Sequence, residues 1–100
     1  MAEMLLLEFN APGEDAAALY RKVSSVLGVD PSSGKGDWPA GMLTHIAGVS
    51  GGDTLVVAET WESKEAQEKA MTEQLLPAFG QVGAPQPSRV QWLTLEGQKR

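Results

Sequence analysis

The sequence contains no cysteine and a single histidine among its 100 residues. Without thiols the chain has no disulfide, no thiolate nucleophile and no cysteine-ligated zinc or iron–sulfur site. A metal site with two histidines would need His45 from two copies of the chain, across a symmetric interface. We therefore expect no bound metal and no cofactor.

Positive charge is scarce, and long apolar segments are lacking. Eight Lys and Arg face thirteen Asp and Glu, which gives a formal net charge of -5. This charge opposes binding to a phosphate backbone, which proteins neutralise with cationic side chains. No apolar run reaches the ~20 residues of a membrane span, and residues 1–9 lack the basic start and long apolar stretch of a signal peptide. We expect no nucleic-acid partner, no membrane association and a cytoplasmic location.

The overall composition is that of an ordinary globular domain. Hydrophobic residues make up 42% of the chain and charged residues 21%, so the chain is able to bury a core. Its length suits one domain. We expect a single domain over residues 1–96, followed by a flexible tail at 97–100.

Apolar and turn-forming residues predict the first elements. The apolar run 4–9 is too short for a helix and ends in turn residues, which predicts a buried strand. Apolar residues then recur at helical spacing over 16–27 until Gly28. Prolines, glycines and serines in 29–41 predict a long loop, whose only large apolar residue is Trp38. Loops of this length are often functional.

A β-hairpin is the strongest local signal. Two β-prone runs, 42–49 and 54–61, flank a Gly-Gly pair that favours a two-residue turn. We therefore expect Ser50 to pair with Asp53.

The remaining residues predict a second helix and a last strand. Ser63 is a good helix N-cap, and Glu65 complements the dipole of the first turn. Pro77 should end or kink this helix, with a short turn running through Phe79. The alternating run 89–95 predicts the final strand.

The order strand, helix, strand, strand, helix, strand predicts an α+β fold of the ferredoxin-like βαββαβ type. It has a four-stranded antiparallel sheet with both helices on one face. The expected register divides the hairpin residues between two faces: Met42, Thr44, Ile46, Leu55, Val57, Glu59 and Trp61 on one, and Leu43, His45, Ala47, Val49, Val56, Ala58 and Thr60 on the other.

Both faces of this predicted sheet are largely apolar, but two helices cover only one. An uncovered apolar face would promote aggregation, and a second copy packed sheet to sheet is the simplest cover. We therefore expect a homodimer. A register slip of one residue would exchange side chains between the faces without removing the need for cover.

Two short segments carry a family resemblance. The lead Asp37-Trp38-Pro39-Ala40-Gly41 and the junction Glu59-Thr60-Trp61-Glu62-Ser63, together with the element order, resemble the antibiotic-biosynthesis-monooxygenase-like family of the dimeric α/β-barrel superfamily. The resemblance covers most of the chain. It implies a dimer in which two sheets form a barrel, with a pocket in each subunit. Some members oxidise polycyclic aromatic substrates with molecular oxygen and no cofactor.

The resemblance also suggests residue roles. Trp61 matches the pocket tryptophan that closes the third strand of catalytic members, and Asn10 lies a few positions from their first-strand asparagine. Haem-degrading relatives carry a histidine on the helix after that tryptophan, where this chain has Met71 and Thr72. His45 does not match that ligand, so we expect no axial ligation of haem.

His45 and Glu59 are the candidates for proton transfer. Imidazole exchanges protons readily near neutral pH, which suits a general base. The alternative is a structural histidine or a dimer contact, since no adjacent carboxylate or nucleophile is evident. Glu59 lies among apolar residues and could handle protons. Its alternatives are a position at the rim of the pocket or a bridge to Arg89.

Four further residues are candidates for substrate binding. Trp61 could stack on a flat substrate or simply fill the gap between layers. Trp38 could line the pocket or plug the interface, and Thr44 shares the expected face of Glu59 and Trp61. Tyr20 could donate to a substrate or pack with its hydroxyl at the surface.

Two functions follow. The first is a cofactor-independent monooxygenase-like protein whose hydrophobic pocket takes an aromatic or polyketide-like molecule. His45, Glu59 and Asn10 are then its catalytic candidates. The second is a non-catalytic dimeric barrel that binds a small hydrophobic ligand or serves as an assembly module.

Overall fold

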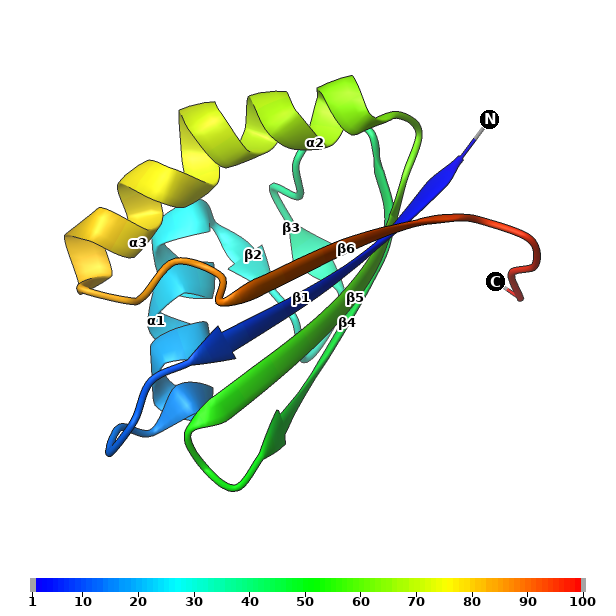
Figure 1. Cartoon of the computed structure of the whole chain (residues 1–100). Coiled ribbons are helices and arrows are strands. Elements are labelled where there is room, and N and C mark those ends of the chain that lie inside the picture. Colours follow the sequence, from blue (N-terminus) through cyan, green and yellow to red (C-terminus); the bar gives the residue numbers. More distant parts are fainter. Residues whose placement is uncertain (1, 100) are drawn as a thin grey trace.

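The computed structural model describes residues 2–99 and has the predicted α+β, ferredoxin-like architecture. The long strands form one antiparallel sheet in the order β4-β5-β1-β6, and the helices lie together on one face of it (Figure 1). The elements are β1 (Glu3–Asn10), α1 (Ala16–Leu27), β2 (Val29–Asp30), β3 (Lys35–Gly36), β4 (Met42–Ser50), β5 (Thr54–Trp61), α2 (Lys64–Ala70), the π-helical segment η1 (Met71–Leu75), α3 (Leu76–Val82) and β6 (Arg89–Thr94).

The helix ends follow local sequence signals. Asp15 caps α1, since its side chain accepts a hydrogen bond from the Ala18 N–H, and Gly28 ends the helix with a φ of 80°. Ser63 caps α2 as predicted, accepting from the Ala66 N–H. The predicted loop 29–41 contains one small addition, a hairpin in which the two-residue strands β2 and β3 pair.

The prediction that the second helix ends or kinks at Pro77, with a short turn through Phe79, was wrong in its extent. The chain stays helical through η1 and α3 to Val82, and Gly83 then ends α3 with a φ of 79°. Proline disrupts a helix by removing an N–H and by clashing with an earlier carbonyl. Here the wider π turn precedes Pro77, which stands in the first turn of α3 and is tolerated there.

The predicted hairpin register was wrong by one residue. Ser50 pairs with Thr54 instead of Asp53, so the turn has three residues and includes Gly51 and Gly52 at positive φ. The backbone of this turn is held by distant partners: the Ala11 N–H donates to the Asp53 carbonyl and the Ala16 N–H to the Gly52 carbonyl. These tertiary bonds withdraw Asp53 from the strand ladder.

The changed register redistributes the side chains of β4. His45 now lies opposite Glu59 on the helix-covered face, whereas the predicted register separated them. An irregularity at Leu43 returns Met42 to that same face, opposite Trp61. Thr44 consequently lies on the other face, opposite Thr60.

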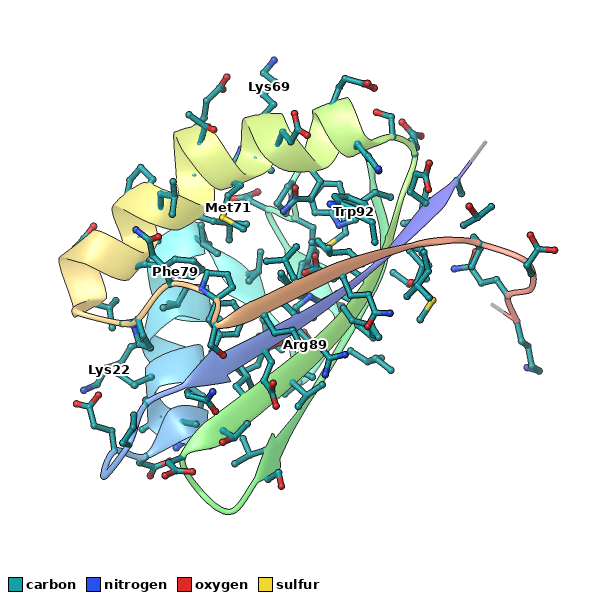
Figure 2. The ribbon with its side chains drawn as sticks, viewed as in Figure 1. Lys22, Lys69, Met71, Phe79, Arg89 and Trp92 are labelled. Carbon is teal, nitrogen blue, oxygen red and sulfur yellow. The ribbon has the colours of Figure 1, made fainter. Side chains whose placement is uncertain are left out.

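The core lies between the sheet and the helices. Its main buried side chains from β1 and β5 are Leu5, Leu7, Leu55, Val57 and Trp61. Met71 and Phe79 point from the helical layer towards the sheet, whereas Lys69 points away from it (Figure 2). None of the helices within residues 2–99 combines the length and apolar character needed to traverse a bilayer.

The opposite side of the sheet, here called the outer face, is covered by none of the helices within residues 2–99 (Figure 1). Ile46 is 71% exposed there, and Val56 is also exposed. The apolar side chains that the register assigns to this face are Met4, Leu6, Ile46, Val56, Ala58 and Leu93. The prediction of two apolar faces with helices on only one is therefore confirmed.

The C-terminal residues that were expected to form a flexible tail make a contact with the sheet. The Gln98 amide donates to the Thr60 hydroxyl at 3.0 Å. Arg100, the last residue of the expected tail, lies outside the described residues, as does Met1 at the start of the expected domain.

Candidate functional site

Glu59 and His45 form a hydrogen-bonded pair on the helix-covered face. Because β4 and β5 pair with these residues directly opposite, His45 Nδ1 comes within 2.7 Å of Glu59 Oε2. The Glu59 side chain is 5% exposed and that of His45 is 13% exposed. The expectation that His45 has no neighbouring carboxylate was therefore wrong, and the register error is the reason.

Trp61 supports the other carboxylate oxygen. Its Nε1–H donates to Glu59 Oε1 at 3.0 Å, and the residue itself is 0% exposed. Trp61 and Glu59 are two residues apart on β5, so their side chains lie on the same face of the strand. Each oxygen of Glu59 thus accepts a hydrogen bond. Arg89, which the sequence suggested as a partner for Glu59, donates to Gln91 instead.

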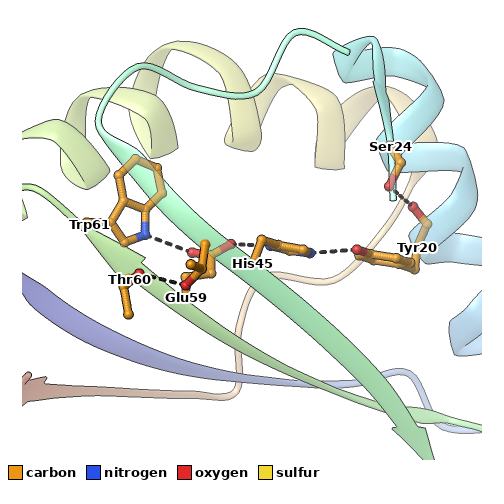
Figure 3. Close-up of polar contacts among 7 residues, drawn as sticks. Tyr20, Ser24, His45, Glu59, Thr60 and Trp61 are labelled. Atoms are coloured by element: carbon orange, nitrogen blue, oxygen red, sulfur yellow. Dashed lines mark hydrogen bonds and ion pairs between the residues drawn. The ribbon is translucent and has the colours of Figure 1, made fainter. Parts of the chain in front are cut away.

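Tyr20, on α1, extends the pair into a line of four side chains (Figure 3). Its hydroxyl oxygen lies 2.6 Å from His45 Nε2, and the two ring planes differ by only 2°. A carboxylate only accepts, so in neutral imidazole Nδ1 carries the proton that is donated to Glu59. Nε2 then accepts from the Tyr20 hydroxyl.

The environment of Tyr20 keeps its hydroxyl protonated. Burial, with a further contribution from the Glu59 charge, raises the pKa of Tyr20 to about 12. Both causes disfavour a second negative charge at this site. At neutral pH Tyr20 is therefore a hydrogen-bond donor to His45.

Trp38 covers the His45 ring from the connection between β3 and β4. The two ring centroids are 5.1 Å apart, with a tilt of 44°. The indole Nε1–H donates to the Gly34 carbonyl, which ties Trp38 to the β2–β3 hairpin. The predicted long loop thus delivers one aromatic side chain to the site.

The line of side chains borders a cavity between the sheet and the helices. Its volume is about 90 Å³, several times the roughly 10–15 Å³ needed for one ordered water. Tyr20, His45 and Glu59 contribute its ionisable groups, and no lysine or arginine of residues 2–99 lines it. Apolar lining residues include Leu7, Phe9, Leu55, Val57, Met71 and Phe79. The cavity is thus an apolar space with one polar wall.

The structure brings five of the seven predicted site residues together and leaves two elsewhere. His45, Glu59, Tyr20, Trp38 and Trp61 are joined by hydrogen bonds or ring contacts, although Trp61 does not itself line the cavity. Thr44 lies on the outer face, where its hydroxyl is 2.6 Å from that of Thr60. Asn10 is exposed at the end of β1 and bonds Ser88 and Thr54.

Sequence reasoning missed the contribution of the helical layer to the cavity. Met71 and Leu75 of η1 and Phe79 of α3 line it. Their spacing of four residues was a signal that they share one helix face. Among residues 2–99, no group of three or more His, Asp or Glu side chains could hold a metal ion.

Comparisons with known proteins show a shared fold at low sequence identity. No protein-family model matches the sequence, and no curated protein matches it either. A proposed antibiotic biosynthesis monooxygenase from Chloroflexus aurantiacus J-10-fl is 14% identical, with a TM-score of 0.67 over 100% of this chain and 98% of its own. Rv0793 from Mycobacterium tuberculosis is 18% identical, with a TM-score of 0.68 over 100% of both chains.

A third similar structure is SnoaB from Streptomyces nogalater, described as a cofactor-independent oxygenase. It is 12% identical, with a TM-score of 0.66 over 97% of this chain and 95% of its own. The predicted resemblance to antibiotic-biosynthesis-monooxygenase-like proteins is therefore confirmed at the level of the fold.

Proposed function

We propose that this protein is a cofactor-independent monooxygenase-like enzyme that takes an aromatic or polyketide-like molecule into the apolar cavity. The observation that carries this proposal is the hydrogen-bonded line Tyr20–His45–Glu59 at the polar wall of that cavity. A carboxylate behind a histidine fixes its tautomer and stabilises the imidazolium that forms when it takes a proton. The apolar walls suit a flat hydrophobic substrate.

The reaction begins with removal of a weakly acidic substrate proton. The resulting anion is delocalised over the aromatic rings and reacts directly with molecular oxygen. For a ring methylene flanked by aromatic rings, the group CH2 plus O2 becomes C=O plus H2O. The substrate is oxidised, one oxygen atom enters the product, and the other leaves as water with both hydrogens. The protein supplies the base, the orientation and the exclusion of bulk water.

The similarity to SnoaB supports this proposal without deciding it. A fold hosts many functions, so function has to be argued from the site. Here the site contributes what the proposed reaction requires from the protein, namely a paired base next to an apolar cavity.

An anthrone-type substrate tests the proposal. The protein is incubated with the anthrone under oxygen, and quinone formation is compared with the uncatalysed background and with the His45→Gln variant. We expect quinone formation that depends on His45. If no quinone forms above background, the oxygenase proposal fails. Stoichiometric anthrone binding without turnover would instead support the non-catalytic binding barrel.

We also propose that the working unit is a cytoplasmic homodimer joined through the outer faces. Ile46 and Val56 expose apolar surface there, next to a hollow that Leu6, Val56, Glu8 and Arg89 help to line. A two-fold contact buries the same patch on both subunits, so it requires a self-complementary surface. The outer face meets this requirement because it carries Glu8 and Arg89 on neighbouring strands beside its apolar centre.

A further inference from the structure

Both nitrogens of His45 already have partners. Nδ1 lies 2.7 Å from Glu59 and Nε2 lies 2.6 Å from the Tyr20 hydroxyl, while Trp38 packs against the ring. In this arrangement no imidazole lone pair is open to a molecule in the cavity. A substrate proton that reaches His45 must therefore arrive through one of its partners.

Tyr20 is the partner with the required chemistry. Its hydroxyl donates one proton to Nε2 and has oxygen lone pairs that accept another. Tyr20 lines the cavity, whereas Trp61, the second donor to Glu59, does not. Glu59 also borders the cavity, but its side chain is only 5% exposed and is held between His45 and Trp61, whereas Tyr20 is less buried.

We propose that Tyr20 is the catalytic residue that meets the substrate, and that it relays the substrate proton to His45. As the substrate proton bonds to Tyr20 Oη, the original hydroxyl proton moves to His45 Nε2. At Tyr20 one O–H bond forms and one breaks, while the substrate loses its bond to the proton and His45 gains an N–H bond. Tyr20 therefore stays neutral, the substrate becomes an anion, and His45 becomes an imidazolium beside Glu59. This inference rests on the proposed function, because it specifies how the base in that reaction is reached.

The electrostatics of the site agree with a relay. Burial and the charge of Glu59 raise the pKa of Tyr20 to about 12, so the residue does not serve as a resident phenolate base near neutral pH. A group that accepts one proton while releasing another avoids that charged state. Trp61 acts as a positioning residue, because its hydrogen bond to Oε1 fixes the Glu59 carboxylate that orients His45.

A nitrophenol probe tests the relay without relying on oxygenation. Its ionised form absorbs visible light, so the ionised fraction of bound probe is measured directly at a pH below its solution pKa. His45 is the only histidine, so nitrogen NMR of histidine-labelled protein reports one ring. In the wild type we expect the bound probe to ionise and His45 Nε2 to gain the proton.

Tyr20→Phe is the decisive variant. We expect it to bind the probe but to lower the ratio of ionised to neutral bound probe about tenfold, equivalent to one unit of probe pKa. His45→Gln should lower the ratio similarly, whereas the exposed control Glu68→Gln should not. If Tyr20→Phe ionises the probe as well as the wild type does, the Tyr20 hydroxyl is not required for the proton transfer and the relay is overturned. Absence of probe ionisation in the wild type also overturns it.

A second measurement covers the case in which Tyr20→Phe does not fold. Tyr20 is the only tyrosine, so incorporation of fluorotyrosine labels this position alone. The fluorine resonance should shift when the bound probe ionises, and an unchanged resonance would contradict the relay. If the probe ionises through Tyr20 but anthrone is not oxygenated, the relay stands and the proposed oxygenase function falls.

Discussion

His45 and Glu59 face each other across β4 and β5, with Nδ1 and Oε2 2.7 Å apart, because Ser50 pairs with Thr54 at the hairpin turn. A shift of one residue in this pairing would move His45 to the outer face. The three-residue turn that follows Ser50 therefore determines whether the base is assembled. The backbone bond from Ala11 to Asp53 helps to hold that turn in place.

Replacement of the carboxylate tests the role of this pair. We expect Glu59→Gln to reduce anthrone oxygenation roughly a hundredfold, because a neutral amide cannot stabilise the imidazolium charge. Anthrone affinity should change little, since the apolar walls supply most of the contact. The measurement is initial quinone formation alongside a binding titration. Glu68→Gln, an exposed substitution on α2, is the matched control. Equal loss in both variants would remove Glu59 from the mechanism.

Replacement of Trp61 tests its structural and positioning roles together. Trp61→Phe removes part of a fully buried ring and leaves Glu59 Oε1 without its donor. We expect the free energy of unfolding to fall by about 2–4 kcal/mol. Urea unfolding followed by circular dichroism measures this. Trp92→Phe, at a partly buried residue of β6, should destabilise less. A comparable loss at both positions would argue that the hydrogen bond to Glu59 contributes nothing.

The elements were predictable because their signals are local, whereas the site depends on contacts between distant residues. Ser63 caps its helix through an amide only three residues away, so a short window of sequence suffices. Tyr20 meets His45 across 25 residues, and no local pattern encodes that contact. The Gly-Gly pair correctly predicted a hairpin but not its register, because the β1–α1 connection helps to fix the turn.

The alkaline titration of Tyr20 tests its environment directly. As the only tyrosine, it gives the entire tyrosinate absorbance signal. We expect a midpoint near a pKa of about 12 in the folded protein, compared with the ordinary tyrosine value of 10.0. Glu59→Gln should lower the midpoint only partly, because burial is the larger cause of the shift. A folded-state midpoint at the ordinary value would show that Tyr20 is not packed against His45 and Glu59.

The raised pKa of Tyr20 predicts that the difference in stability between the wild type and Tyr20→Phe depends on pH. Between the unfolded-state pKa and the higher folded-state value, the folded protein binds more protons, so stability falls as pH rises through this range. Tyr20→Phe lacks this contribution. We expect the variant to be less stable than the wild type near pH 8, by about 1 kcal/mol for the lost hydrogen bond. The difference in free energy of unfolding between the two proteins should narrow from roughly pH 10 upwards, because only the wild type loses stability there. Urea unfolding at several pH values measures it, and a constant gap would contradict the assignment.

Substitution of Gly41 tests how the connection that carries Trp38 joins β4. Its φ is +89°, and a Cβ placed there would lie 2.6 Å from the Cβ of Ala66 on α2. Gly41→Ala therefore combines backbone strain with a clash, and we expect a loss of about 2–4 kcal/mol in urea unfolding. Gly34→Ala is the matched control, because its φ of +75° brings strain, while no atom of residues 2–99 beyond its chain neighbours lies within 4 Å of the added Cβ. Equal losses would show that α2 does not press against Gly41.

A substitution on the outer face tests the proposed dimer separately from the cavity. Ile46 is 71% exposed on that face, and we expect Ile46→Lys to convert the dimer into a folded monomer in sedimentation at micromolar concentration. Val26→Lys, on the exposed surface of α1, should leave the dimer intact. A wild-type protein that sediments as a folded 10.6 kDa monomer would refute the dimer. The cavity lies on the other side of the sheet, so the Ile46→Lys monomer should still bind the nitrophenol probe.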